Sequence, residues 1–173
     1  MKKAIKPDPA FLSPEFTLGV ATSSFQIEGD ANGREKSIWD TFCEQPGKIQ
    51  DGSHGLVACD HVNRWEDDIK LIRSLNVDAY RFSLSWPRII NADGSVNQNG
   101  LDFYIGILDR LAEYNIKAYV TLYHWDLPQY LEDNGGWLNR DTAFAFADYV
   151  DVVTKAFGSK VYSYATLNEP YCS

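Results

Sequence analysis

The apolar residues of this chain follow two different periods along the sequence. Four short stretches rich in β-branched and aromatic residues have the pattern of strands. They cover residues 16–24, 78–86, 117–125 and 161–170. Between them, apolar residues recur at every third or fourth position, which is typical of helices that bury one face. These helices are predicted over residues 60–75, 101–114 and 141–157, and Gly158 is placed to end the last of them.

The predicted order β-α-β-α-β-α-β favours a parallel sheet with right-handed crossovers. Two architectures have this order, the open doubly wound sheet and the (β/α) barrel. The turn after the first strand reads "ATSSFQIEGDANG" and lacks the glycine-rich fingerprint of a nucleotide-binding open sheet. Polar and aromatic residues gather instead at the carboxyl ends of strands one, three and four, where a barrel keeps its active site.

A complete barrel has eight strands and typically about 250 residues. The 173-residue chain shows four. We therefore predict an α/β fold that consists of the first four β/α units of a (β/α)₈ TIM barrel. The whole chain, 1–173, is expected to form one domain, with the C-terminal half of the barrel absent.

Glu169 is the first candidate for chemistry, because "TLNEP" presents it at the tip of the fourth strand. Pro170 disfavours helical geometry at Glu169, so we expect an extended backbone there. A glutamate that works as a general acid needs burial or a nearby negative charge to stay protonated. The neighbouring Asn168 can donate its amide hydrogen to a sugar hydroxyl. By itself, "NEP" is equally typical of an ordinary strand-to-loop junction.

Three further residues at strand ends suit the recognition of hydroxyl groups. His124 and Trp125 end the third strand with an imidazole beside an indole, and Gln26 follows the first strand. A glutamine can hold two adjacent sugar hydroxyls, because it both donates and accepts. Alone, His124 is also typical of a structural histidine, and Gln26 of a surface glutamine. Asp126 does not complete metal-ligand spacing with His124, so no metal site is predicted.

Arg81 stands in the middle of the second strand, between apolar neighbours. Strand alternation turns Phe82 and Leu84 toward the helices and Arg81, with Ser83 and Ser85, toward the barrel interior. A guanidinium there needs an acidic partner. The chain offers no strong candidate, because its glutamates near other elements are predicted on loops or helices.

Composition narrows the classes of function. Hydrophobic residues make up 45% of the chain and charged residues 23%, which is typical of a globular domain. The net charge of −8 argues against nucleic acid and against an anionic membrane surface as partners. No apolar leader or membrane-spanning stretch is seen, so a cytoplasmic location is expected. Cys43, Cys59 and Cys172 are odd in number and widely spaced, which favours reduced thiols.

Seven motifs in order give the chain a close resemblance to glycoside hydrolase family 1, the β-glucosidase and β-galactosidase family. They are "FTLGVATSSFQIEG", "GREKSIWDTFC", "ACDHVNRWEDDI", "YRFSLSWPRI", "VTLYHWDLPQYL", "GGWLN" and "TLNEP". The resemblance implies a barrel that hydrolyses β-glycosides with retention and needs no cofactor. The substrate implied is a β-glucoside or a short β-linked oligosaccharide.

The resemblance also assigns roles to residues. Glu169 matches the general acid/base, and Arg81 matches the arginine that touches the catalytic nucleophile. The sugar contacts fall on Gln26, His124, Trp125 and Asn168, with Asn168 on the 2-hydroxyl. The nucleophile of the family lies on the seventh strand, in a "TENG"-type motif that this chain does not contain. Many members also have tryptophan in place of Tyr164.

Two other interpretations stay open. The chain could be a non-catalytic sugar-binding or assembly module, in which Gln26, His124 and Asn168 keep weak sugar affinity. It could also be another barrel glycosidase, such as an endo-acting cellulase, although "SSFQIEG" and "HWDLPQ" argue against that. Half a barrel exposes strand edges. The expected partners are therefore a complementary C-terminal half or a second copy that associates through the open edges.

Overall fold

A computed structural model describes residues 8–171 of the chain, so Cys172 lies outside the described residues. Within this range, four parallel strands form one sheet in the chain order β1-β2-β3-β4. The strands are β1 (Gly19–Ala21), β2 (Ala79–Ser83), β3 (Lys117–Tyr123) and β4 (Ser163–Leu167). The predicted alternation of strands and helices is confirmed.

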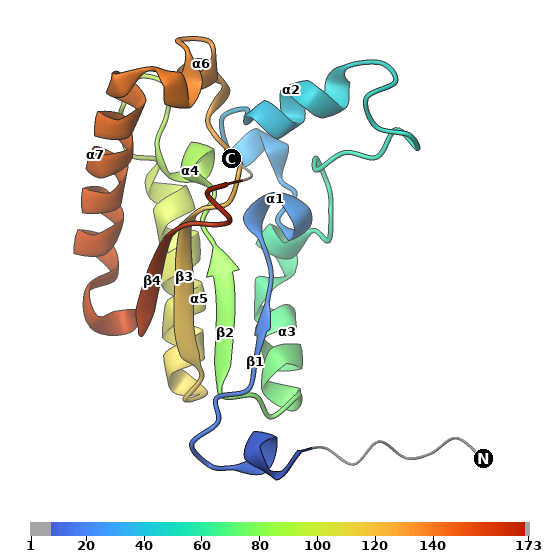
Figure 1. Cartoon of the computed structure of the whole chain (residues 1–173), viewed down its shortest axis with the longest axis vertical. Helices are drawn as coiled ribbons and strands as arrows, with labels where there is room; N and C mark the ends of the chain where they lie inside the picture. Colours follow the sequence, from blue (N-terminus) through green and yellow to red (C-terminus); the bar gives the residue numbers. More distant parts are fainter. Residues whose placement is uncertain (1–7, 172–173) are drawn as a thin grey trace.

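Three long helices connect the strands and lie on one side of the sheet. They are α3 (His61–Ser74), α5 (Gln98–Glu113) and α7 (Arg140–Phe157). In Figure 1, α5 lies behind the middle of the sheet and is flanked by α3 and α7, while no long helix covers the face toward the viewer. A doubly wound sheet would carry helices on both faces. The one-sided cover is the arrangement of a barrel wall.

Side chains alternate across the sheet as predicted from the sequence. On β2, Tyr80 and Phe82 are buried against the helices, and Leu84 after the strand is also fully buried. Val120 and Leu122 of β3 join them in one hydrophobic core. Each buried side chain of this size contributes about 1.5–3 kcal/mol to stability. The core thus holds the sheet to the helices and leaves the opposite face free.

The long helices begin and end at residues that satisfy their terminal backbone groups. The side chain of Asn97 accepts a hydrogen bond from the backbone N–H of Gly100 at the start of α5. The side chain of Asn139 accepts one from Asp141 at the start of α7. α7 ends at Gly158, which has a φ of 54°. Such caps are typical of stable helix ends, and the stop at Gly158 agrees with its prediction.

The strands are shorter than predicted, and two of them are followed by short helices that the sequence did not indicate. α1 (Ser24–Ile27) follows β1, and α4 (Trp86–Ile89) follows β2. Pro87 lies in the first turn of α4, a position that tolerates its missing N–H. The other short helices are α2 (Ile38–Glu44), α6 (Gln129–Glu132), η1 (Pro9–Leu12), η2 (Ala31–Gly33), η3 (Gly136–Leu138) and η4 (Gly158–Lys160).

A buried ion pair fixes the loop after α1 to the helices behind it. Arg88 donates to Glu28 Oε2 at 2.9 Å, to the carbonyl of Gly29 at 2.9 Å and to Asp30 at 3.1 Å. Tyr104 of α5 donates its hydroxyl to the other oxygen of Glu28 at 2.5 Å. Removing one partner would leave a buried charge, which is strongly destabilising. The network therefore fixes the backbone next to Gln26. None of the described helices combines the length and apolarity needed to cross a membrane.

Candidate active site

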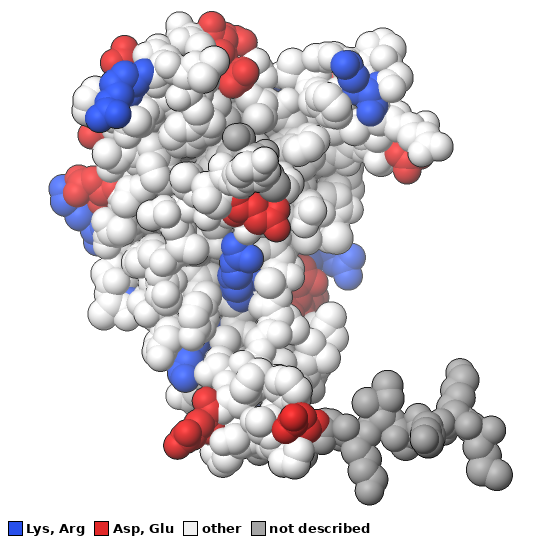
Figure 2. Space-filling model, in the orientation of Figure 1, with Lys and Arg blue, Asp and Glu red and all other residues white. Residues whose placement is uncertain are grey.

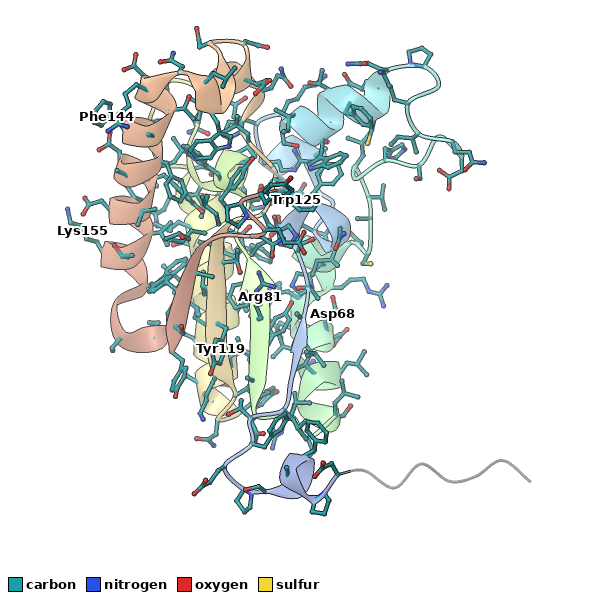
Figure 3. The ribbon with its side chains drawn as sticks, viewed as in Figure 1. Asp68, Arg81, Tyr119, Trp125, Phe144 and Lys155 are labelled. Carbon is teal, nitrogen blue, oxygen red and sulfur yellow. The ribbon has the colours of Figure 1, made fainter. Side chains whose placement is uncertain are left out.

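The carboxyl ends of the four strands bring the predicted site residues to one edge of the sheet. Arg81 comes from β2, His124 and Trp125 directly follow β3, and Asn168 and Glu169 directly follow β4. Figure 3 shows Arg81 on the uncovered face of the sheet and Trp125 above it, toward the carboxyl ends of the strands. Residues that are far apart in the sequence thus share one surface.

Asn168 joins three of these residues by hydrogen bonds. Its side-chain oxygen accepts from Arg81 Nη2 at 2.7 Å, and its amide nitrogen lies 3.2 Å from His124 Nε2. Its backbone carbonyl accepts from the indole of Trp125 at 2.9 Å. Asn168 is only 9% exposed, so these contacts are shielded from water. They fix the ends of β2, β3 and β4 relative to one another.

Arg81 has neutral hydrogen-bond partners in the described part of the chain. Besides Asn168, it donates from Nε to the hydroxyl of Thr121 at 2.9 Å. The sequence predicted an acidic partner, and among residues 8–171 no carboxylate forms an ion pair with Arg81. On the uncovered face, charged side chains gather mainly near the margin, and the middle holds one basic group beneath an acidic one (Figure 2). Arg81 occupies the place of that basic group in Figure 3, on the uncovered face of the sheet.

His124 is held in its neutral form. An amide nitrogen can only donate, so Asn168 donates to Nε2 of His124 and the imidazole proton resides on Nδ1. Burial lowers the pKa of His124, and the positive charge of Arg81 lowers it further, while Glu169 acts in the opposite direction. In this tautomer Nε2 is already engaged by Asn168, and the Nδ1–H is buried without a hydrogen-bond partner among the described residues, so the imidazole has one donor left and no acceptor.

Two residues of the site have left-handed backbone conformations. Trp125 has a φ of 71° and Glu169 a φ of 44°, so the expectation of an extended backbone at Glu169 was wrong. Such angles are unfavourable for residues with a side chain and gather at functional sites. The hydrogen bond from the Trp125 indole to Asn168 joins the two turns and holds them in place. Glu169 itself is exposed.

Gln26 lies in α1 rather than after a longer strand, and it lines a cavity with His124 and Trp125. The cavity has a volume of about 390 Å³. Phe25 and Trp39 also contribute to its wall, so flat aromatic rings stand beside polar groups. Gln26 is exposed, which leaves its amide free for a ligand. An uncharged polyhydroxyl ligand is well matched by this combination.

Residues 9–173 match the sequence profile described as "Glycosyl hydrolase family 1". The chain belongs to this family. It is 51% identical to a β-glucosidase of Agrobacterium sp. over 162 residues, which is 92% of this chain and 35% of that protein. It is 54% identical to β-glucosidase A of Thermotoga maritima over 159 residues, 90% of this chain and 36% of that protein.

Solved structures of glycosyl hydrolase family 1 proteins confirm the fold. A β-glucosidase from Exiguobacterium antarcticum B7 superimposes with a TM-score of 0.89 at 49% identity, covering 92% of this chain and 36% of that one. A T. maritima β-glucosidase in complex with deoxynojirimycin gives a TM-score of 0.87 at 53% identity, covering 92% and 37%. The chain thus spans about a third of the length of these relatives, and its fold is the first four β/α units of their barrel.

The sequence did not identify every residue of this site. One residue that it missed is Thr121, which accepts a hydrogen bond from Arg81. Strand register could have indicated Thr121, because it pairs with Ser83, and Ser83 lies on the same face of β2 as Arg81. Phe25 and Trp39 come from the short helices α1 and α2, which are too short to show a sequence period. Among residues 8–171, no three histidine, cysteine or acidic side chains form a group that could hold a metal ion.

Tyr164, at the position of the usual family tryptophan, does not reach the site. Its neighbour Ala165 pairs with Thr121 on the open face, so Tyr164 points to the helices and packs against the core. Its hydroxyl is buried without a hydrogen-bond partner among the described residues. The exchange of tryptophan for tyrosine therefore belongs to the packing of β4 and not to ligand contact.

Proposed function

We propose that this chain supplies the acid/base half of the active site of a retaining β-glycoside hydrolase. The reaction is of the β-glucosidase type, on terminal β-D-glucosyl residues. The observation that carries the proposal is the set of hydrogen bonds through Asn168, which gathers Arg81, His124 and Trp125 beside Glu169. Membership of glycosyl hydrolase family 1 gives this arrangement its chemical context.

The uncharged groups of the site hold the sugar. Gln26 exchanges hydrogen bonds with hydroxyl groups, neutral His124 donates to one through its protonated nitrogen, and the indole of Trp125 covers an apolar face of the ring. Asn168 lies beside Glu169 and contacts the 2-hydroxyl, an interaction that strengthens as the oxocarbenium-like transition state forms. These residues orient the glycosidic bond before any proton moves.

Glu169 then acts in both steps of the reaction. As an acid, it gives its proton to the glycosidic oxygen while the bond to the anomeric carbon breaks. As a base, it later takes a proton from the water that releases the sugar from the enzyme. Retention needs a second carboxylate about 5–5.5 Å away, which attacks the anomeric carbon.

The second carboxylate is expected to come from barrel strands that the relatives have in addition to these four. Arg81 supports this, because within residues 8–171 its guanidinium has only neutral hydrogen-bond partners, and it faces the open side of the sheet. A carboxylate opposite Arg81 would be held in its ionised, nucleophilic form. The same additional strands would bury Glu169, which is exposed here, and burial is the setting that a general acid needs.

The test is a hybrid enzyme that joins this chain to the part of T. maritima β-glucosidase A that it does not cover. We expect the hybrid to hydrolyse β-glucosides with retention, and the 173-residue chain alone to lack this turnover. In the hybrid, Glu169→Gln should lower kcat/KM about 10²- to 10⁴-fold for an alkyl glucoside that needs protonation. The loss should be much smaller in the first step with a nitrophenyl glucoside, whose leaving group departs without an acid.

Glu113→Gln is the matched control, because Glu113 is an exposed carboxylate at the end of α5. It should leave both substrates unaffected. Equal losses with both substrates on Glu169→Gln would contradict an acid/base role for Glu169. Full activity of the isolated chain, lost on Glu169→Gln, would contradict the need for a second half.

A second candidate function is sugar binding without chemistry by the chain alone. The cavity of about 390 Å³ favours it, since Gln26, His124 and Trp125 line it without help from another chain. Calorimetric titration of the chain with glucose is the test. Heat of binding that is lost on His124→Ala supports this function, whereas no heat at high glucose concentration contradicts it.

A further inference from the structure

A buried chain of hydrogen bonds joins three strand ends beneath the candidate active site. Ser83 Oγ, at the end of β2, donates to Ser24 Oγ at 3.1 Å, and Ser24 Oγ donates to Asp126 Oδ2 at 2.6 Å. The backbone N–H of Ser24 also donates to Ser83 Oγ at 2.8 Å. All three residues are at most 2% exposed. Neither the motifs nor the proposed reaction assigns them a role.

Each member of this chain lies two positions from a residue of the site. The pairs are Ser24 with Gln26, Ser83 with Arg81, and Asp126 with His124. The three site residues come from separate elements, α1, β2 and the turn after β3. Asn168 connects Arg81 to His124 from above, but it forms no hydrogen bond with α1 among the described residues. The buried serines and Asp126 therefore provide the connection to Gln26.

We propose that Asp126 is a positioning residue, which through Ser24 sets the place of Gln26 relative to His124 in the sugar-binding cavity. The carboxylate is the common anchor, because its own segment carries His124 and its hydrogen-bond donor belongs to the helix that carries Gln26. A displacement of about 1 Å between such groups is enough to lower the efficiency of a site strongly. The consequence for sugar affinity rests on the function proposed above; the coupling of the two segments does not.

The surroundings of Asp126 make this anchor sensitive to protonation. Burial is the main cause that raises the pKa of Asp126 to about 7, and the negative charge of Glu28 acts in the same direction. The hydrogen bond from Ser24 and the positive charge of Arg34 act in the opposite direction. The hydroxyl groups of Tyr123 and Tyr149 also face Asp126. Its second oxygen, Oδ1, is buried without a partner among the described residues.

The sign of the effect follows from these shifts. An ionised carboxylate accepts the Ser24 hydrogen bond more strongly than a neutral acid, so the connection tightens as pH rises through about 7. Stability changes in the opposite sense. The folded-state pKa is raised from 3.8 to about 7, so stability is lost as pH rises through that window. His124 titrates separately, because its pKa is lowered from 6.5.

The test follows side-chain signals of the 173-residue chain by ¹H–¹⁵N NMR over a pH series around neutrality. The Gln26 amide and the Trp125 indole should shift together with a midpoint of about 7. Asp126→Asn should abolish both shifts. Ser24→Ala should abolish only the Gln26 shift and leave that of Trp125. Asp68→Asn, which removes the partner of His61 on α3, is the control and should leave both shifts in place.

Affinity gives a second, independent measurement, with deoxynojirimycin as the probe. We expect Asp126→Asn and Ser24→Ala each to weaken its binding about tenfold, a loss of about 1.4 kcal/mol. If the chain binds no probe but the coupled shifts are present, the proposed function of the chain alone fails and the positioning role stands. Coupled shifts that persist in Asp126→Asn, or a Gln26 shift that survives Ser24→Ala, would overturn the positioning role.

Discussion

At the scale of single residues, opposite charges act on one imidazole. Arg81 and Glu169 both lie close enough to influence His124, and Asn168 holds Arg81 and His124 in fixed positions. The pKa of His124 therefore reports whether the predicted site residues act on one another in solution. Because the two charges have opposite signs, removing each one should move this pKa in a different direction.

We expect Arg81→Gln to raise the pKa of His124 and Glu169→Gln to lower it further. The first change removes a positive charge that opposes the imidazolium, and the second removes a negative charge that favours it. NMR titration of the imidazole carbon-bound protons measures both. Arg64→Gln, at an exposed position of α3, is the matched control and should leave the pKa of His124 unchanged. Shifts of the same sign in both variants would contradict the arrangement described here.

The hydroxyl group of Tyr164 gives a residue-scale prediction for stability. It is buried and has no partner in the described part of the chain, so Tyr164→Phe should stabilise the fold by about 1 kcal/mol. Tyr149→Phe is the matched control, because the Tyr149 hydroxyl donates to the Leu122 carbonyl at 3.0 Å. Tyr149→Phe should destabilise the fold by about 1 kcal/mol. Urea unfolding measures both variants. A loss of stability in both variants would show that Tyr164 has a partner.

At the scale of elements, the first turn of α5 packs very closely on α4. A Cβ at Gly100 would lie 2.0 Å from the backbone oxygen of Arg88, whose side chain holds the loop beside Gln26. The approach of the two helices therefore requires a residue without a side chain. It also connects the position of α5 with that of the site.

Gly100→Ala should destabilise the fold by about 1–3 kcal/mol, because a backbone atom must move to admit the methyl group. Gly106→Ala in the same helix is the control. Its Cβ would meet only the Trp65 ring at 3.3 Å, and the gain in helix propensity of about 1 kcal/mol offsets that contact. Chemical denaturation measures both variants. Equal effects at the two positions would contradict close α4–α5 packing.

The elements that sequence predicts well are the long helices, because their hydrophobic period repeats over several turns. The helix of α7 and its stop at Gly158 follow from spacing and a single glycine. α1 and α4, of four residues each, are too short to show a period, and so the sequence did not indicate them. The contact of Ser24 with Asp126 spans 102 positions, and only the packing of α1 against the β2 and β3 ends creates it. Motifs located Arg81, His124 and Asn168, but not the hydrogen bonds among them.

At the scale of the whole molecule, β1 and β4 each pair with one strand only, so both have an unpaired edge among the described residues. The uncovered face beside them carries few charges near its middle (Figure 2). On β4, Ser163, Ala165 and Thr166 are exposed. Open edges of this kind favour pairing with another chain. A complementary half of the barrel or a second copy of this chain would satisfy the same edges.

We expect the 173-residue chain by itself to associate through the β4 edge and the uncovered face. Ala165→Lys places a charge there and should shift sedimentation toward the monomer, since lysine on an edge strand opposes pairing. Ala147→Lys adds the same charge to an exposed position of α7, on the opposite side of the sheet, and should leave association unchanged. A monodisperse monomer with cooperative unfolding before any substitution would contradict the prediction. If the complementary part of the T. maritima enzyme is added in trans, it should compete with self-association, because both use the same two edges.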